Sequence, residues 1–511
     1  MKKLLLLSLA GLLLATTACK REQRSQSTGW GYNSQEWGGF EKLPNYKGQI
    51  TGPNLVLIEG GTFNMGQTEE DVMKDYRAAP RRQSLASFYM DETEVTNIDW
   101  LEYLYYLRRV YPSMPQVHMQ ALPDTLAWLD ELSYNTPYVE NYLRHPAYED
   151  YPVVGVTWLQ ANEFCKWRSD RVNEMLLIEQ GKIDPTSIEG QQGENTFSTG
   201  SYLSGIYQAQ PGPKPAVNPA TGEERAVRFE DGIMLPEYQL PTEAQWEFAA
   251  LALLGNQSAA RDENITDRRI YPWDGTTVRY PQHGRYQGAI VANFKRGRGD
   301  YMGMSGALND NASITAPVRS FVPNDFGLYN MAGNVNEWVR DVYRPTTSLT
   351  LEDNNELNSF RGNVFTQVER NSNGTPVGVD SIGRLKYKPL DDNEIKDRRN
   401  FTKSNVINYG DGDIESRLNY GDSKLNNETK HMYQFGKHSL ISDKARVYKG
   451  GSWADRAYWL SPGQRRFLDE DKASATIGFR CSMLRVGSPS GNRFKGGNQI
   501  KTRKKRTKRK F

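Results

Sequence analysis

The first apolar segments of the chain predict short strands followed by a helix. Leu55–Gly66 (LVLIEGGTFNMG) starts with an apolar run and continues into a Gly-Gly pair, which is typical of a strand and a turn. Ala86–Asn97 (ASFYMDETEVTN) indicates a second strand. Thr96 or Asn97 can cap the helix that follows, whose apolar residues share one face: Trp100, Tyr103, Leu104 and Leu107.

The same order of strand, cap and helix recurs twice. In the segment PVVGVTWLQANEFCKW, Thr157 is a candidate cap, and the inward face of the helix carries Trp158, Ala161 and Cys165. In the segment LPTEAQWEFAALALL, Thr242 and Gln245 form the pattern of a capping box, and the inward face carries Trp246 and Ala249. These segments predict one domain of mixed helix and strand at residues 53–484.

Two long polar stretches interrupt this domain. Residues from about 176 to 237 are rich in Gly, Pro, Gln and Thr, and residues from about 343 to 445 are rich in Asn, Asp and Lys. Neither stretch has a sustained helical or strand period. We therefore expect both to be insertions that loop out of one domain.

The N-terminus has the pattern of a secretory signal at residues 1–18, with Lys2 and Lys3 before the apolar run Leu4–Ala15. That run is shorter than the roughly 20 residues that a membrane-spanning helix needs. Small residues precede Cys19, as in a bacterial lipobox, so we expect Cys19 to carry a lipid anchor. The alternative is an ordinary cleavage site beside an incidental cysteine.

Residues 19–52 are expected to be a linker and arm. Within them, Thr28–Phe40 (TGWGYNSQEWGGF) alternates aromatic residues with glycine and cannot form a core of its own. The segment is either an arm lying on the main domain or a surface that adheres to a partner. At the other end, residues 485–511 are expected to be a disordered basic tail.

Charge and metal-ligand spacing exclude several function classes. The net charge is +3, but residues 493–511 hold ten Lys or Arg and no Asp or Glu, so the rest of the chain is net negative. This distribution differs from that of a nucleic-acid binder, and we expect no nucleic-acid partner.

CxxC and HExxH motifs are absent and the five histidines are scattered, which argues against a zinc or non-haem iron site.

The ordered motifs together resemble the formylglycine-generating enzyme (sulfatase-modifying factor) family. They run from LIEGGTFNMG through LPTEAQWEFAA, YPWDG and NMAGNVNEW to YKGGSW and IGFRC. The resemblance implies an α+β domain, related to C-type lectins, with much irregular backbone and two long insertions. Within the family, the chain looks most like the gliding-motility lipoproteins of the type IX secretion apparatus, in the GldJ group and next in the GldK/PorK group.

The resemblance also indicates a lost active site. Active members of the family hold copper with two cysteines between the GGS turn and a downstream arginine. The interval from Ser452 to Arg465 contains no cysteine, and Ser, Asp and Arg cannot supply the thiolate that Cu(I) requires. We therefore expect no copper and a pseudoenzyme. Ser452, Trp453 and Arg465 become packing and hydrogen-bonding residues, and Cys165 and Cys481 become structural.

Calcium is a separate expectation from the same resemblance. One family loop maps onto Asn330 and Glu337 side chains with Gly333 and Val335 carbonyls, and a second onto Asn293 and Asp310 side chains with Phe294 and Ala312 carbonyls. Oxygen-rich ligation of this kind is what Ca²⁺ prefers. The alternative for both is a polar loop stabilised by its own Asn and Asp turns.

The leading functional hypothesis is a non-catalytic lipoprotein anchored at the periplasmic face of the outer membrane. It would act as an interaction subunit of the type IX secretion and gliding-motility machinery, with other subunits as partners and peptidoglycan nearby. Basic residues after Cys19, in KREQRS, favour the periplasmic face. The alternatives are a formylglycine-generating oxidoreductase and a periplasmic glycan- or peptidoglycan-binding lipoprotein, which needs aromatic faces beside amide and acid groups.

Overall fold

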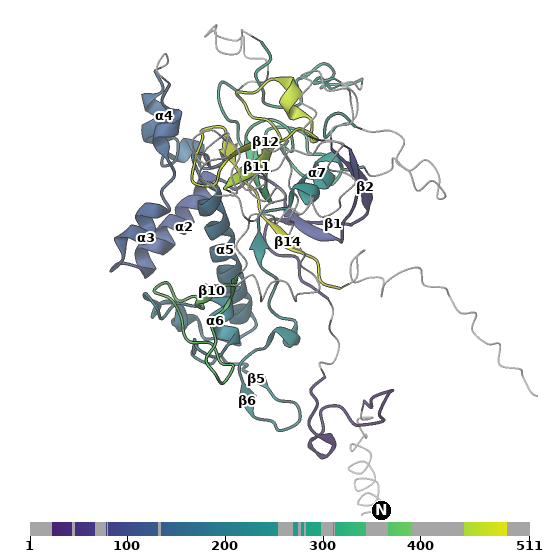
Figure 1. Ribbon diagram of the computed structural model, residues 1–511, viewed down its shortest axis with the longest axis vertical. Coiled ribbons are helices and arrows are strands. Elements are labelled where there is room, and N and C mark those ends of the chain that lie inside the picture. The colour runs from purple at the N-terminus through teal and green to yellow at the C-terminus, as the bar shows by residue number, and fades with distance from the viewer. Residues whose placement is uncertain are drawn as a thin grey trace, which may run out of the picture.

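The structure is a computed structural model, shown in Figure 1. It describes residues 23–42, 46, 48–66, 78, 80–130, 134–253, 269–273, 277–280, 283–297, 310, 312–343, 366–390 and 444–487. The signal segment, Cys19 and the basic tail from residue 488 lie outside the described residues. Within the described residues, no helix is both long and apolar enough to cross a membrane.

The first sheet joins the two ends of the domain. Its strands lie in the order β1 (Leu55–Ile58), β4 (Phe88–Asp91), β14 (Ser482–Leu484) and β7 (Tyr238–Gln239), all antiparallel. The apolar runs predicted near residues 55 and 88 are therefore neighbours in one sheet. Phe88 of β4 lies opposite Leu484 of β14. The strand that follows the IGFRC motif therefore pairs with the strand of the Ala86–Asn97 segment.

The second sheet carries the GGS turn and the NMAGNVNEW motif. Its order is β12 (Arg466–Asp469), β11 (Ala445–Lys449), β8 (Asn336–Val342) and β13 (Ile477–Gly478), with β13 parallel to β8 and the other pairs antiparallel. Three two-stranded ribbons complete the sheet structure: β2 (Thr62–Met65) with β3 (Arg81–Ser84), β5 (Ala216–Val217) with β6 (Glu224–Arg225), and β9 (Thr366–Val368) with β10 (Tyr387–Pro389).

The three predicted helices form where their caps predict. These helices are α2 (Asn97–Val110), α5 (Trp158–Glu179) and α7 (Glu243–Leu251), and each begins with a capping box. Thr96 is the cap of α2, whereas the Asn97 side chain donates hydrogen bonds to the carbonyls of Tyr142 and Tyr148. In Figure 1, α2 and α3 lie on one side of α5, and the two four-stranded sheets and α7 lie on the other.

The remaining helical segments are short. Three are α-helical: α3 (Pro115–Gln120), α4 (Thr136–Asn141) and α6 (Thr199–Leu203). The others are 3-10 turns at Gln35–Trp37, Thr125–Trp128, Pro146–Tyr148, Pro185–Ile188, Phe229–Asp231 and Ala457–Leu460. Much of the described chain is thus irregular, as expected.

The main core lies between α2, α5 and the sheets. Trp100 of α2 stacks on Phe164 of α5 with ring centroids 5.3 Å apart, and Phe479 packs edge-on against both rings. Trp246 of α7 and Trp338 of β8 are fully buried. Burial of such large aromatic surfaces is the main source of stability in this arrangement.

The first polar stretch is more structured than its composition indicates. Helix α5 continues to Glu179, past the predicted start of the insertion at residue 176. Residues 176–237 then form a small apolar cluster that includes Leu177, Phe197 and Met234. Residues 366–390 are the described part of the second polar stretch, and they contact the first stretch. The Ser198 hydroxyl, for example, donates to the carbonyl of Gly383.

The arm at residues 23–42 folds on itself through short aromatic and hydrogen-bonded contacts. Trp30 and Trp37 lie 6.3 Å apart, and Tyr32 and Phe40 lie 5.7 Å apart between ring centroids. The arm also touches the first insertion, where Glu41 pairs with Arg225 at 3.1 Å. Large aromatic surface stays exposed, with Trp30 55% and Phe40 64% accessible.

Candidate functional site

The GGS turn follows β11 and is tightly packed. Gly450 and Gly451 have positive φ angles of 101° and 72°, and a side chain at Gly451 would clash with Leu460 and with the carbonyl of Trp459. The turn delivers Ser452 into the core, where it is fully buried. Its hydroxyl donates to Asp455 Oδ2 at 2.6 Å.

Asp455 is itself held by cations and amides. Arg466 donates to both oxygens of Asp455 at 2.6 and 2.7 Å, and Asn336 Nδ2 donates at 3.0 Å. Burial opposes ionisation of Asp455, but these bonds and the charge of Arg466 outweigh it, so its pKa is lowered. The Ser452 hydroxyl therefore donates to a carboxylate that Arg466 and Asn336 already hold in place.

Arg465 lies in a second buried charge cluster under the same turn. Its Nε donates to Glu243 Oε1 at 2.6 Å, and Lys449 Nζ donates to Glu243 and Glu247 at 3.1 and 2.7 Å. Burial would raise the pKa of Glu243, but Arg465 and Lys449 lower it to about 2. Burial and the charge of Glu243 raise the pKa of Asp341 to about 7.

These contacts confirm that Ser452 and Arg465 are buried hydrogen-bonding residues of the core. The donors present between them do not fit copper, because none is a thiol and the acids are bound by cations. No chemical step can be derived through a metal at this position.

The first predicted calcium loop is occupied by an ion pair. Arg480 Nη2 and Nε donate to the two oxygens of Glu337 at 2.6 and 2.7 Å, and Trp246 Nε1 donates to the carboxylate at 2.7 Å. All three side chains are fully buried. The expected ligand Glu337 is thus paired with a buried cation, and calcium at this loop stays a prediction.

The asparagines of this loop bind a second buried acid. Asn330 Nδ2 donates to Glu94 Oε2, and Asn334 Nδ2 donates to Glu94 Oε1, both at 3.0 Å. Burial and the nearby charge of Glu337, against the opposing charge of Arg480, raise the pKa of Glu94 to about 7. The side chains of this loop are thus bound to residues of other segments, namely Glu94, Trp246 and Arg480.

The second predicted calcium loop brings its four residues together. Asp310 accepts hydrogen bonds from the backbone amides of Phe294 and Ala312, each at 3.1 Å, and Asn293 precedes Phe294 in the chain. The loop contacts the first one, since the amide of Asn334 donates to the Asn293 carbonyl at 2.8 Å. Among the described residues, no three His, Cys, Asp or Glu side chains cluster as a metal site. Calcium here remains a proposal that rests on Asp310.

Cys165 and Cys481 meet in the core beside the first sheet. Their sulfurs lie 2.9 Å apart, and both side chains are buried. Burial, followed by the contact with Cys481, raises the pKa of the Cys165 thiol well above its usual range. Neither cysteine falls in the interval from Ser452 to Arg465, and their buried contact is compatible with a structural role for both.

The family profile for the sulfatase-modifying factor enzyme 1-like domain matches residues 40–384, which is more than half of the chain. The chain belongs to this family. The family and its fold, expected from the motifs, are thereby confirmed. The subgroup of gliding-motility lipoproteins stays a prediction.

Individual relatives are distant. The chain is 23% identical to the formylglycine-generating enzyme of Mus musculus, across 65% of this chain and 70% of the enzyme. It is 23% identical to the inactive Cα-formylglycine-generating enzyme 2 of Bos taurus, across 57% and 71%. It is 24% identical to the chaperone protein LppX of Paenibacillus barcinonensis, across 56% and 70%. The structure of PvdO from Pseudomonas aeruginosa superposes with a TM-score of 0.38, 14% identity, and coverage of 84% and 94%.

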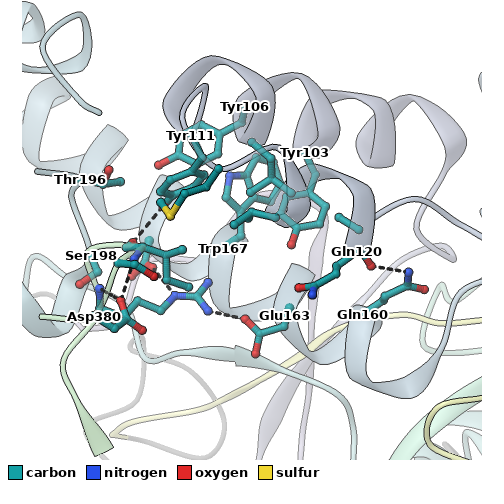
Figure 2. A pocket seen from close by; sticks show the side chains of 18 of the residues that line it. Tyr103, Tyr106, Tyr111, Gln120, Gln160, Glu163, Trp167, Thr196, Ser198 and Asp380 are labelled. Carbon is teal, nitrogen blue, oxygen red and sulfur yellow. Dashed lines mark hydrogen bonds and ion pairs between the residues drawn. The ribbon is translucent and has the colours of Figure 1, made fainter. Parts of the chain in front are cut away.

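Sequence reasoning missed a cavity of about 700 Å³ that Figure 2 shows. Helices α2, α3 and α5 form one part of its wall, and residues 196–198 and 380–384 of the two insertions form another. The part of the cavity wall that local sequence could indicate is on α5, where Trp167 and Arg171 are one helical turn apart and share one face. The rest of the wall comes together only in the folded chain.

Proposed function

We propose that this chain is a non-catalytic lipoprotein, anchored at the periplasmic face of the outer membrane. It acts as an interaction subunit of the type IX secretion and gliding-motility machinery. The observation that carries the non-catalytic part is the environment of the former copper position. Ser452 and Arg465 are buried and bound to Asp455 and Glu243, and the interval between them has no thiol.

Inactive relatives support this proposal. One of the similar proteins is named an inactive Cα-formylglycine-generating enzyme and another a chaperone protein. Family membership is thus compatible with a role that uses the fold as a scaffold. Function on a fold is set by its sites, and the buried contacts of Ser452 with Asp455 and of Arg465 with Glu243 support a role without the chemistry of the active enzymes.

An interaction role is supported by the arm. Trp30, Phe40 and Tyr46 are each more than half exposed, and they follow one another along a segment next to the expected lipid anchor at Cys19. Exposed aromatic side chains of this kind are typical of protein interfaces. The arm would meet a partner close to the membrane surface.

The proposal is tested by isolating the lipidated full-length chain from membranes of the native cell and identifying what accompanies it. Secretion and motility subunits are the expected partners. Recovery of sulfatase-like substrates would favour the oxidoreductase alternative and contradict the proposal.

Cys19→Ala provides the matched control for anchoring, because more than one acyl chain is needed for stable membrane attachment. The variant should stay unprocessed or soluble and lose those partners. Normal outer-membrane fractionation of Cys19→Ala would overturn the lipoprotein assignment.

A further inference from the structure

Two glycines of the arm lie directly against its two indole rings. A Cβ atom at Gly31 would lie 2.9 Å from Cδ1 of Trp37, which is closer than a real side chain comes. A Cβ atom at Gly38, where φ is 81°, would lie 3.6 Å from the ring of Trp30. The alternation of glycine with aromatic residues in this segment therefore lets the backbone pass close to both rings. The rings themselves pack together, with centroids 6.3 Å apart.

This indole pair is held in place and yet is open to the outside. Trp30 is 55% exposed and Trp37 is 36% exposed. The backbone beneath them is fixed, because the amide of Ser25 donates to the carbonyl of Trp30 and the amide of Tyr32 donates to the carbonyl of Gln23, both at 2.8 Å. Exposed apolar surface of this size, kept in one position, is typical of an interaction site.

The indole pair lies close to the expected lipid anchor. Only residues 20–22 separate Cys19 from Gln23. A chain of this length spans at most about 14 Å when it is fully extended. Gln23 is hydrogen-bonded to Tyr32, so the turn that carries Trp30 begins within that reach. If the acyl chains of Cys19 lie in a bilayer, the indole pair cannot lie far above its headgroups.

The charge of this segment fits a headgroup layer. Residues 20–29 contain three basic residues and one acidic residue. The guanidinium of Arg24 lies 5.9 Å from the ring centroid of Trp37, so positive charge and indole surface are side by side. Basic side chains are attracted to anionic lipid headgroups. Tryptophan is enriched at the interface between membrane and water, because its ring is apolar and its N–H is polar.

The arm is also attached to the main domain. Glu41 pairs with Arg225 at 3.1 Å and with Arg228 at 3.5 Å, and both arginines belong to the first insertion. In Figure 1 the arm lies at the same end of the molecule as β5 and β6, away from the two four-stranded sheets. A membrane contact made by the arm therefore turns that end of the domain toward the bilayer.

We propose that Trp30 and Trp37 insert into the headgroup region of the bilayer and orient the domain on it. This inference rests on the lipid anchor proposed above at Cys19. It assigns to the membrane the part of the arm nearest the anchor, and it leaves Phe40 and Tyr46 for a protein partner. Two indoles do not hold a protein of this size on a membrane by themselves. They act because the anchor keeps them at a high local concentration beside the lipid.

The test is tryptophan fluorescence of the lipidated chain in vesicles of phosphatidylethanolamine and phosphatidylglycerol. Half of the preparations contain lipids with bromine near the headgroup end of the acyl chains, which quenches only nearby indoles. Since the chain has 11 tryptophans, quenching of Trp30 and Trp37 should lower the total emission by about two parts in 11. This loss should disappear in Trp30→Phe/Trp37→Phe, which keeps aromatic rings but removes both indoles.

Two control variants bracket this measurement. Trp273→Phe should keep the full loss of emission, because Trp273 lies in the main domain, where its indole donates to the Thr277 carbonyl at 2.8 Å. Cys19→Ala should show no loss, because the indole pair is not retained at the bilayer without the anchor. Mass spectrometry of Cys19 and flotation with vesicles test the anchor separately from the indole pair.

An acylated chain that floats with the vesicles but is not quenched by bromine would overturn this inference and leave the anchor in place. Equal quenching in Trp30→Phe/Trp37→Phe would overturn it as well, because other tryptophans would then face the bilayer. An unquenched wild type, together with loss of co-purified subunits in Trp30→Ser/Trp37→Ser, would assign the indole pair to a protein partner instead. An unacylated Cys19 would reject the anchor and this inference with it.

Discussion

The sulfurs of Cys165 and Cys481 lie 2.9 Å apart although the two residues are separated by 316 positions. The contact joins α5 to the residue just before β14. Strand β14 pairs with β4 in the first sheet. A covalent bond at this point would enclose most of the domain in one loop. It would remove many conformations from the unfolded chain.

We predict that oxidising conditions convert this contact into a disulfide. Reduction should then lower the free energy of unfolding by about 2–5 kcal/mol. Peptide mapping under non-reducing conditions and melting curves with and without reductant provide the measurement. A Cys165→Ala/Cys481→Ala variant should melt at the same temperature with or without reductant. Free thiols after exhaustive oxidation would contradict the prediction.

The buried pair of Glu337 and Arg480 gives a test of the calcium proposal. Glu337→Gln leaves Arg480 buried beside a neutral amide, which should cost about 3–5 kcal/mol of stability. If calcium binds at Asp310, added Ca²⁺ should raise the melting temperature of the wild type and of Glu337→Gln alike. Asp310→Asn should remove that increase.

The same melting curves discriminate between the two loops. Loss of the calcium effect in Glu337→Gln, with its retention in Asp310→Asn, would assign the ion to the first loop. Indifference of the wild type to calcium and to chelator would reject both loops.

The buried carboxyl of Asp341 should make the free energy of unfolding depend on pH. Its pKa is raised to about 7 by burial and by Glu243, so the native state keeps a proton that the unfolded chain releases near pH 4. The contribution of Asp341 to stability is therefore full below about pH 4 and falls as pH rises to about 7. Asp341→Asn should remove this loss and stabilise the protein at pH 8 by about 1–3 kcal/mol.

Urea unfolding from pH 5 to 8 measures this effect. Asp325→Asn is the control, because Asp325 is 46% exposed in its pair with Arg269 and should leave the slope unchanged. An Asp341→Asn protein with the wild-type slope would show that this carboxyl does not hold the proton.

The arm gives a prediction about partners. Replacing Trp30 and Phe40 by serine should leave the melting temperature within about 1 °C of wild type, because both side chains are mostly exposed. The same change should sharply reduce co-purification with the membrane assembly. Tyr134→Ser removes an aromatic residue that is 85% exposed elsewhere and should have no effect. Full recovery of partners by the arm variant would reject the arm as an interface.

The elements that could be predicted from sequence are those whose hydrogen bonds are local. Thr157 and Gln160 are three residues apart, so the capping box of α5 can be recognised from a short stretch of sequence. The inward positions of Trp100 and Trp246 follow from helical spacing for the same reason. What could not be predicted is pairing over long separations, such as Glu337 with Arg480 or Ser198 with Gly383. Nothing in the local sequence marks one partner for the other.

The composition of the insertions was misleading for a related reason. Their Gly, Pro and Asn residues indicate turns, yet a few apolar residues such as Phe197 and Met234 suffice for a small core once α5 is beside them. The cavity depends on that docking, because residues 196–198 and 380–384 acquire their positions only against α5. Period and composition carry no information about such a neighbour.

We infer that the segment from Ser452 to Arg465 is part of the core and performs no oxidation. The most direct measurement is incubation of the purified chain with Cu(I), oxygen, a reductant and a cysteine-containing sulfatase-type peptide, followed by mass spectrometry of the peptide. We predict an unchanged cysteine and no tight copper binding, since Ser452 and Arg465 lie in closed contacts with Asp455 and Glu243. Conversion of the cysteine to formylglycine, with loss of that conversion in Ser452→Ala, would show that the protein is an active oxidoreductase.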